Sequence, residues 1–447
     1  MIGRVNDLGL SVAVITLGCP KNEVDSEFIK GELSHSGFNL VSDIQEAHII
    51  VINTCGFIEP AKCESIETII ECTRCKRGEK CQLLAVVGCL AQRYFNELSK
   101  EIPEIDLLLG VNCALKLPEK IEEVLRGKRV IDVKKPSINP SELLTRMKPE
   151  TPSAYLKISD GCNNRCSYCA IPFIRGSYRS HHLGSLVNEV NFLVQAGVRE
   201  ITFVGQDISN YGIDIYDKRK LPELISKLSA IEGLDWMRLL YVQPDGISDE
   251  LLIALANNPK VCNYIDVPFQ HASEKILRMM RRGGSAGNYL SLLDKIRNHV
   301  PNIAIRTSLM VGFPGETDED FEELAEFVQA GLFDYLGVFK YSAEEGTEAN
   351  AFASQVADEV KGERYHQLIS LQDSLAFERN KRYRGKRMKV LVESIDGEKN
   401  FSGRNQYQAF EIDGIVYFEG RNLKIGDFVE VIITAVDGYD LIGEMLC

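Results

Sequence analysis

The chain has 447 residues, of which 45% are hydrophobic and 26% are charged, a balance typical of a folded protein with a sizeable core. A chain of this length predicts two or three domains instead of one. Its formal net charge of −13 does not favour a protein that grips nucleic acid through the phosphates, and indicates a basic partner instead.

Thirteen cysteines are many, but a disulfide scaffold is usually a small secreted chain with a signal peptide. The stretch LGLSVAVITLGC can be read as a signal that ends at a lipidated Cys19. Asp7 beside Arg4, the short apolar run and the helix-like pattern after Pro20 argue against that interpretation. No run approaches the roughly 18 apolar residues of a membrane span. We therefore expect a cytoplasmic protein with no membrane partner, whose reduced thiols are available to metals.

Residues 10–130 alternate apolar runs with helical patterns, which predicts a parallel α/β domain. The strand runs are VAVITLG, HIIVINT, QLLAVVG and DLLLGV. The first three end at or next to a cysteine: Cys19, Cys55 and Cys89. Because the carboxyl ends of parallel strands share one edge of the sheet, these thiols are expected to converge in space.

Four further cysteines in this domain compete with that set: Cys63, Cys72, Cys75 and Cys81. Cys72 and Cys75 form a CxxC pair that could bind zinc together with the other two. On a helix, however, Cys63 and Cys72 point to opposite faces. Free thiols are therefore the default, and a second metal site is the alternative. The remaining cysteines, Cys113, Cys262 and Cys447, are interpreted as structural or incidental.

Residues 131–152 are rich in Pro, Ser and charge and are predicted to link this domain to a second one, residues 153–382. Six strand candidates follow: AYLKISD, EITFVGQ, WMRLLYVQ, YIDVPFQ, AIRTSLMVG and YLGVFKYS. Six βα units are fewer than the eight that close a full barrel, so we expect an open, partial (βα)6 barrel. Residues 383–447 show short alternating runs with Gly and Asn, which predict a small all-β barrel of five strands.

Cys162, Cys166 and Cys169 follow the first predicted barrel strand with the spacing CxxxCxxC, in a loop where such folds place their chemistry. A structural zinc site needs four ligands, and His181 or His182 would have to supply the fourth. A four-iron cluster accepts thiolates at such short spacings. Three thiolates would leave the fourth iron open to a small molecule.

This motif, with Tyr168 before its last cysteine, resembles the radical S-adenosylmethionine (SAM) superfamily. The resemblance implies that the open iron binds SAM and that an electron from the cluster cleaves it to a 5′-deoxyadenosyl radical. We predict SAM contacts at Tyr168, Gln206, Asp207, Arg306, Gly312 and Gly315. A capped strand end is the alternative for Gln206 and Asp207. No catalytic residue beyond the cluster ligands is predicted.

Two arginines near the CxxxCxxC motif, Arg175 and Arg179, are candidates to meet a substrate carboxylate. A salt-bridged role for at least one of them is the alternative.

The stretches LGCPKNEVDSE, INTCGFIEPAK and VVGCLAQRY, with that motif and a terminal small barrel, resemble the methylthiotransferase family from about residue 12 to 447. The resemblance implies an auxiliary four-iron cluster on Cys19, Cys55 and Cys89, so two 4Fe–4S clusters in all, and a C-terminal TRAM domain. It also implies that one SAM methylates a sulfur at the auxiliary cluster, while a second yields the radical.

Two motifs resemble the RimO-like branch of that family. The tRNA-modifying branch usually has Gln-Met-Asn where this chain has Pro20-Lys21-Asn22, and tends to have Ser-Gly at His271-Ala272. The RimO-like branch implies transfer to the β-carbon of an aspartate in the twelfth small-subunit ribosomal protein, with an electron donor of the reduced flavodoxin or ferredoxin type.

The last domain favours the same branch on independent grounds. From residue 384 onward there are eight Lys and Arg against eleven Asp and Glu, which suits a basic protein substrate better than RNA. The alternatives are a MiaB-like tRNA adenosine methylthiotransferase and, more remotely, a non-catalytic, metal-stabilised module that binds ribosomes or RNA.

Overall fold

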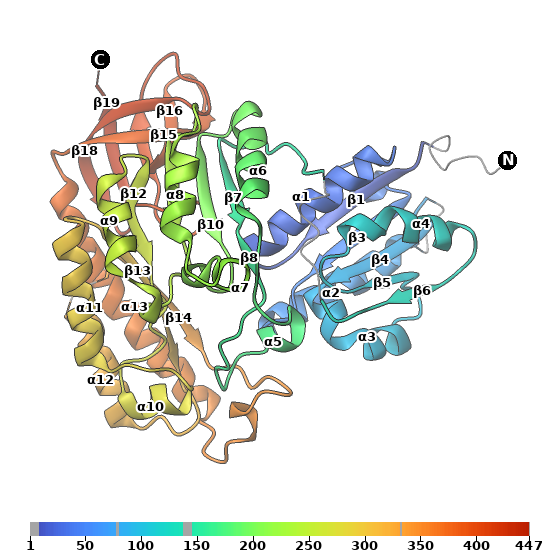
Figure 1. Cartoon of the computed structure of the whole chain (residues 1–447), viewed down its shortest axis with the longest axis horizontal. Coiled ribbons are helices and arrows are strands. Elements are labelled where there is room, and N and C mark those ends of the chain that lie inside the picture. The colour runs from blue at the N-terminus through green and yellow to red at the C-terminus, as the bar shows by residue number, and fades with distance from the viewer. Residues whose placement is uncertain (1–8, 77–79, 137–144, 331–332, 447) are drawn as a thin grey trace.

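The computed structural model describes residues 9–76, 80–136, 145–330 and 333–446. They form three units in chain order (Figure 1): two parallel α/β units side by side, and a small β-barrel at one end of the second. Within these residues, no helix has the length and apolar character needed to span a membrane. Cys447 lies outside the described residues.

The first unit is a six-stranded parallel sheet in the order β2-β1-β3-β4-β5-β6, as predicted for its class. Its strands are β1 (Ser11–Thr16), β2 (Asn39–Leu40), β3 (Ile49–Thr54), β4 (Leu83–Gly88), β5 (Leu107–Leu109) and β6 (Val130–Asp132). Its helices are α1 (Pro20–His35), α2 (Glu59–Lys76), α3 (Cys89–Glu101) and α4 (Leu117–Leu125). Every residue of β3 and β4 is buried, which explains their continuous apolar sequence.

Two strands of this sheet were not among the sequence-based expectations, namely β2 and β6. They have only two and three residues, and neither contains a buried one, so they lack the apolar run on which the prediction depended. Strand β6 ends at Asp132, just inside the segment expected to be a linker.

The second unit confirms the open, partial (βα)6 barrel. Its six parallel strands follow the order β14-β13-β12-β11-β10-β7, so that β14 and β7 are the edges of this described sheet. The strands are β7 (Ser153–Lys157), β10 (Glu200–Val204), β11 (Trp236–Leu239), β12 (Val261–Asp266), β13 (Ala304–Val311) and β14 (Tyr335–Lys340). A separate antiparallel pair joins β8 (Ser159–Asp160) to β9 (Arg179–Ser180).

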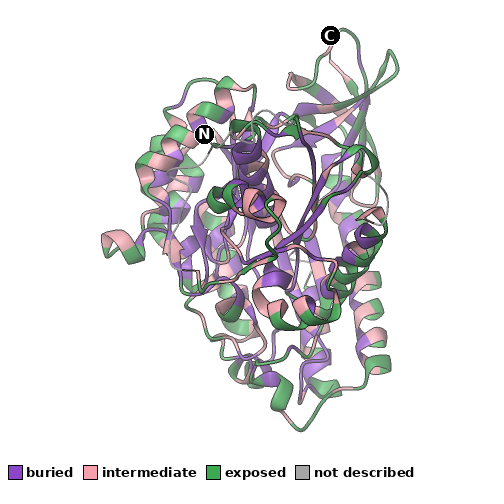
Figure 2. Cartoon of the chain, turned by 90° about the vertical axis from the view of Figure 1, so that its right-hand side faces the viewer, coloured by how far each residue is buried: buried purple, intermediate pink, exposed green. Residues whose placement is uncertain are grey.

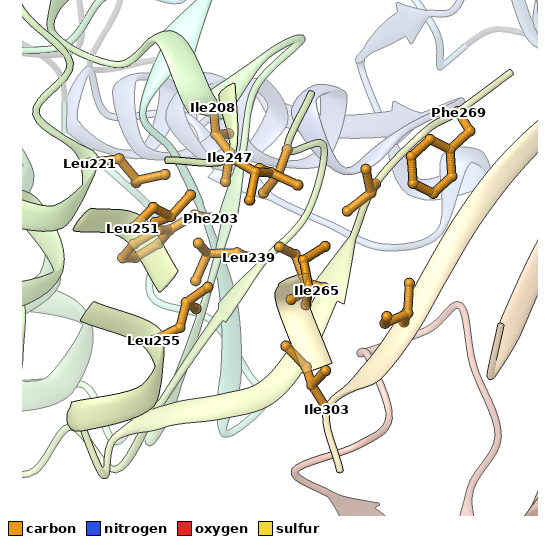
Figure 3. Close-up of a cluster of buried hydrophobic side chains, with 14 of the residues drawn as sticks. Phe203, Ile208, Leu221, Leu239, Ile247, Leu251, Leu255, Ile265, Phe269 and Ile303 are labelled. Carbon is orange, nitrogen blue, oxygen red and sulfur yellow. The ribbon is translucent and has the colours of Figure 1, made fainter. Parts of the chain in front are cut away.

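The longer helices cover the outside of this barrel: α6 (Leu183–Gln195), α8 (Leu221–Ser229), α9 (Asp249–Asn257), α11 (Ala286–His299), α12 (Asp318–Gln329) and α13 (Asp358–Asn380). Three shorter helices lie in the connecting segments: α5 (Ile171–Ile174), α7 (Ile213–Tyr216) and α10 (Glu274–Met279). Buried residues line the strands and the inner sides of the helices, whereas exposed residues lie on the outer sides of the helices (Figure 2). One cluster fills the space between strands and helices (Figure 3), with Phe203, Leu239 and Ile265 from the strands and Leu251 and Leu255 from α9.

The third unit confirms the predicted small barrel. It is a closed barrel in the order β15-β16-β17-β19-β18 with its own core. The strands are β15 (Arg387–Asp396), β16 (Asn400–Asn405), β17 (Val416–Glu419), β18 (Phe428–Asp437) and β19 (Asp440–Met445). Closure removes free strand edges.

The small barrel docks on the amino ends of the second unit's strands. Arg404 Nη2 lies 2.5 Å from Glu200 Oε2 at the start of β10 and 2.6 Å from Glu393 Oε1 of β15. Arg238 Nε of β11 lies 2.8 Å from the other Glu200 oxygen. Both arginines and Glu200 are buried. This docking leaves the opposite, carboxyl ends of the strands for the cysteine loop.

Helix α1 of the first unit packs along β7. Arg146, which precedes β7, holds this contact: its Nε lies 2.6 Å from Glu27 of α1 and its Nη1 2.6 Å from Glu189 of α6. At the start of α1, Glu23 lies close to Glu411 of the third unit, whose carboxylate accepts from Tyr155 Oη at 3.3 Å. All three units therefore meet at this helix.

Replacement of Arg404 by alanine is expected to lower the free energy of unfolding by about 3–5 kcal/mol, because it leaves Glu200 buried with one cation fewer. The matched control is Arg278→Ala, which removes a 2.7 Å pair with Glu274 from a side chain that is 76% exposed. That change is expected to cost less than about 1 kcal/mol. Denaturant unfolding of both variants measures the difference, and equal losses would contradict the assigned role of Arg404.

Stability is also expected to depend on pH through Glu23. Burial, and then the charge of Glu411, raise the pKa of Glu23 from 4.5 to about 7. The folded protein thus holds this proton more tightly than the unfolded chain does. The resulting stabilisation is complete below pH 4.5 and disappears as the pH rises to about 7. Thermal unfolding across this range is expected to show a smaller decline in Glu23→Gln, and an unchanged slope would contradict the assignment.

Candidate active site

The three cysteines of the first unit lie at one edge of its sheet. Cys19 precedes the first residue of α1, Cys55 directly follows β3, and Cys89 is the first residue of α3, directly after β4. Strands β1, β3 and β4 are parallel neighbours, so their carboxyl ends meet. The thiols are close enough for charge on Cys55 and Cys19 to raise the pKa of Cys89, which burial chiefly raises to about 12. The predicted convergence of the three thiols is present.

Asn22, in the first turn of α1, joins the three cysteine loops. Its side-chain amide donates to the carbonyl oxygens of Leu17 at 2.8 Å and Thr54 at 3.0 Å, which precede Cys19 and Cys55. Its Oδ1 lies 3.7 Å from Cys89 Sγ. Asn22 is fully buried. Asn22 was named only as part of the Pro20-Lys21-Asn22 motif and not as a site residue, although a polar residue on the buried face of a helix is a usable signal.

Glycines bring the loops close together. Gly18 has φ +95°, and a Cβ there would lie 2.6 Å from Cys55 Cβ. Gly88 has φ +91°, and a Cβ there would lie 2.4 Å from Asn53 Oδ1. Only glycine adopts these backbone angles without strain and leaves this space free. The cysteine loops therefore depend on glycine immediately before Cys19 and Cys89.

The second cysteine set lies in the loop between β8 and α5. The amide of Cys162 donates to Gly176 O at 3.2 Å, and that of Cys169 donates to Cys166 O at 3.1 Å. Burial, followed by smaller contributions that include the neighbouring thiols, raises the pKa of Cys162 to about 11 and of Cys169 to about 12. Arg282 Nη1 lies 3.9 Å from Cys166 Sγ. The three thiols therefore form a second group at the carboxyl ends of the barrel strands.

Both donor sets suit a cluster better than a single ion. Across the described part of the chain, no three Cys, His, Asp or Glu side chains are arranged to hold one metal ion. This finding does not support the zinc interpretation that required His181 or His182. In a four-iron cluster each cysteine binds a different iron, so three separated thiols fit it, and three soft thiolates are the ligands that iron–sulfur clusters use.

Three of the four additional cysteines also lie near one another: burial first, and then charge on Cys75 and Cys81, raises the pKa of Cys72 to about 12. Among the described residues they are not arranged to hold a metal ion. Cys63 is exposed on α2, whereas Cys72 on the same helix is buried, which agrees with the prediction that they face opposite sides. Cys75 is half-buried and Cys81 is buried. All twelve described cysteines are free thiols.

Gln206 follows β10 and Gly205; the residue is half-buried, and its amide oxygen and nitrogen are buried. Among the described residues, its Oε1 and Nε2 have no hydrogen-bond partner. A buried amide with neither group satisfied is costly unless a ligand or water completes it. The position next to the CxxxCxxC loop makes a ligand contact at Gln206 chemically suitable.

Asp207 has a different environment. It is buried, and its carboxylate accepts from Ser209, Asn210 and, at 3.2 Å, from Asn164 Nδ2 in the cysteine loop. Its oxygens are thus occupied by the loop and by the short helix that begins after it (Ile208–Asn210). This is the capped strand end considered as the alternative.

Tyr168 packs against Phe313 with its ring edge-on, at 6.5 Å between centroids. Gly312 has φ +72° and donates to Glu316 Oε2 at 2.9 Å, while Gly315 has φ +84° and donates to Ser354 O at 2.7 Å. Gly312 and Gly315 lie in a turn that follows β13. This turn lies at the carboxyl ends of the barrel strands, as Cys162 does.

Arg306 lies elsewhere, although a SAM contact was predicted for it. Three residues into β13, its Nη1 lies 3.0 Å from Asp413 of the small barrel, and its Nε 3.9 Å from Asp266. It therefore belongs to the contact between the second and third units. The alternation of the strand could not reveal which side chains face a separate domain.

Arg175 and Arg179 were candidates to meet a substrate carboxylate. Arg175 is fully buried in ion pairs with Asp25 and Asp160. Arg179 donates to the carbonyl oxygens of Ser177 and Arg175. The salt-bridged alternative applies to Arg175.

Sequence profiles of three families match the chain. They are the radical SAM superfamily at residues 156–328, the uncharacterized protein family UPF0004 at 11–110, and the TRAM domain at 385–446. Each match falls within one of the three units of the structure, and the first covers the CxxxCxxC motif.

Similar full-length proteins carry the description ribosomal protein uS12 methylthiotransferase RimO. The one from Acetivibrio thermocellus is 44% identical over 445 residues, which are 97% of this chain and 98% of that protein. The one from Geobacter sulfurreducens is 45% identical over 439 residues, with 97% and 98% covered. The one from Desulforamulus reducens is 45% identical over 444 residues, with 97% and 99% covered.

Solved structures share the fold. The radical SAM methyltransferase TsrM from Kitasatospora setae, with tryptophan and a SAM analogue bound, has a TM-score of 0.58 at 14% identity, covering 83% of this chain and 90% of that one. The cobalamin-dependent radical SAM enzyme OxsB has a TM-score of 0.55 at 11% identity, covering 84% and 61%. This likeness concerns the arrangement of the α/β units.

Replacement of Gly18 by alanine is expected to displace Cys55 and to prevent iron binding at the first cysteine set. After anaerobic reconstitution, the protein is expected to hold about eight iron atoms per chain and the variant about four. The control is Gly197→Ala, which has a similar φ of +104° but no atom within 4 Å of the new Cβ. Iron and sulfide analysis checks this, and a full iron content in Gly18→Ala would contradict it.

Proposed function

Because the chain belongs to the RimO family of ribosomal protein uS12 methylthiotransferases, we propose that it adds a methylthio group to the β-carbon of an aspartate in this small-subunit ribosomal protein. One observation carries the proposal: two sets of three thiols lie at the carboxyl ends of two adjoining parallel sheets. The family uses SAM and two 4Fe–4S clusters, which require this number of thiolates.

The two sets have separate roles in the proposal. Cys19, Cys55 and Cys89 hold the auxiliary cluster, and Cys162, Cys166 and Cys169 hold the cluster that binds SAM. When bound, SAM and the clusters supply the radical chemistry that replaces a β-hydrogen of the aspartate with a methylthio group.

The residues around the second set orient SAM. The unsatisfied amide oxygen of Gln206 accepts from the ammonium group of SAM, and the half-buried ring of Tyr168, supported from behind by the buried Phe313, lines the site. Gly312 and Gly315 let the backbone approach the nucleoside closely. Asp207 does not contact SAM in this proposal. Its carboxylate accepts from Asn164, which lies between Cys162 and Cys166 in the sequence, and so holds the cysteine loop in place. We do not assign Arg306 to SAM, because Asp413 already pairs with it.

The substrate is proposed to be a basic protein. The segment from residue 384 onward carries eight Lys and Arg against eleven Asp and Glu, and that charge disfavours contact with RNA phosphates. A reduced flavodoxin or ferredoxin supplies the electrons in this proposal. A cytoplasmic location suits both the substrate and a chain whose described cysteines are free thiols.

A paired anaerobic assay tests the function. Reconstituted protein, SAM and a reductant are offered the ribosomal protein and bulk tRNA in parallel, and mass spectrometry measures the methylthio gain. We expect a gain on one aspartate-containing peptide and none on tRNA. A gain on tRNA adenosine alone would replace the proposed substrate with that of the MiaB-like branch, and SAM that stays intact would refute the radical chemistry.

Two cysteine variants separate the clusters in the same assay. Cys162→Ala is expected to abolish SAM cleavage to 5′-deoxyadenosine and transfer together. Cys89→Ala is expected to retain that cleavage and lose transfer. The opposite pattern would exchange the roles of the two sets.

A further inference from the structure

Arg175 connects the two cysteine sets. It follows α5 in the loop after Cys169, and its Nη1 lies 2.8 Å from Asp160 Oδ1, two residues before Cys162. The ion pair therefore closes the loop that carries the second cysteine set. With 2% exposure, Arg175 is among the largest buried side chains in the described structure.

The other end of the same guanidinium reaches the first unit. Arg175 Nη2 lies 2.7 Å from Asn22 Oδ1 and 2.9 Å from Asp25 Oδ2, both on α1. The planar fork of arginine allows these contacts and the one with Asp160 at the same time. Lysine has one nitrogen and cannot reproduce them.

Asn22 connects Arg175 to the first cysteine set. As described above, its amide holds the carbonyl groups of Leu17 and Thr54, and its Oδ1 lies 3.7 Å from Cys89 Sγ. The oxygen that accepts from Arg175 is thus the one closest to Cys89. A displacement of Arg175 would therefore move Asn22 and, with it, the loops that carry Cys19, Cys55 and Cys89.

The charge of Arg175 also acts on the first set. Its guanidinium donates through Nη2 to the same Asn22 oxygen that lies 3.7 Å from Cys89 Sγ, so the positive charge lies beside the first cysteine set. A buried cation next to thiolates favours added negative charge at that place. Lys157, the other cation of this network, pairs with Asp25 and lies 3.0 Å from Asp160.

We propose that Arg175 is a positioning residue that, through Asn22, sets the auxiliary cluster relative to the SAM-binding cluster and makes the auxiliary cluster easier to reduce. The proposal rests on the proposed function. In this proposal Arg175 couples the two cysteine sets. SAM cleavage at the second set leads to methylthio transfer from the first set only while the contact between Arg175 and Asn22 is intact.

The test compares three full-length reconstituted variants: Arg175→Gln, Arg175→Lys and Arg146→Gln. Arg146 is the matched control, because it is also buried and also joins α1 to the second unit, through Glu27 and Glu189. Glu27 lies about two helical turns beyond Cys19. Iron content and thermal unfolding show which variants retain both clusters and the fold.

The first readout is the reduction potential of each cluster, by potentiometric titration followed with EPR, where the signal that responds to added SAM belongs to the second set. We expect Arg175→Gln to shift the potential of the other cluster to a more negative value. Arg175→Lys, which keeps the charge, is expected to shift it less, and Arg146→Gln to leave it unchanged. An unchanged potential in Arg175→Gln would overturn the electrostatic part of the proposal.

The second readout is the number of 5′-deoxyadenosine molecules formed per methylthio product. We expect both Arg175 variants to lower transfer by about 100-fold while SAM cleavage falls much less, because a displacement of about 1 Å costs that much in rate. The same ratio as in the unmodified protein, or an equal change in Arg146→Gln, would overturn the positioning role. If the unmodified protein made no methylthio product, the proposed function would fail. The reduction potentials of the clusters would still test the electrostatic role of Arg175.

If Arg175→Gln binds too little iron for a titration, the test is which of the two cysteine sets has lost its iron. Loss confined to the first set, with Arg146→Gln intact, supports the proposal, because Asn22 then fails to hold the three loops. Equal loss from both sets in both variants would overturn it.

Discussion

Four charges between α1 and the start of the barrel, three of them buried and one half-buried, fix how the two α/β units lie against each other. Lys157 and Arg175 are the cations, and Asp25 and Asp160 are the anions. Removal of such charges from water is costly unless each one is paired with good geometry, so only one register of the two units satisfies all four. This register also fixes the relative positions of the cysteine loops. Asp160 and Arg175 enclose the loop of the second set, and Asp25 lies on α1, which begins directly after Cys19 of the first set.

Burial disfavours the thiolate and so raises the pKa of Cys89 in the first set and of Cys169 in the second to about 12. At neutral pH, Cys89 and Cys169 therefore hold their protons until iron replaces them. Metal binding and proton release are coupled in such a site. Both loops are already held in place by their own hydrogen bonds, through Asn22 in the first unit and through Asp207 and Asn164 in the second.

Much of this arrangement could be predicted from the sequence, because it follows from periodicity. Apolar runs with a cysteine at the end predicted both the parallel sheet and the meeting of Cys19, Cys55 and Cys89 at one edge. Short strands such as β2 lacked a run to detect. The environments of Arg175 and Arg306 could not be predicted, since each pairs with a carboxylate more than a hundred residues away in the chain, and sequence spacing carries no information about such contacts.

The attachment of the small barrel has a consequence for how such proteins diversify. It is fixed to the amino ends of the β-strands through Glu200 and Arg404, whereas the cysteine loop and the turn after β13 lie at the carboxyl ends. Substitutions on the outer face of β16, β17 or β19 thus change the surface of the barrel without moving the cysteine loops. A lineage could acquire a new target there and keep the same chemistry.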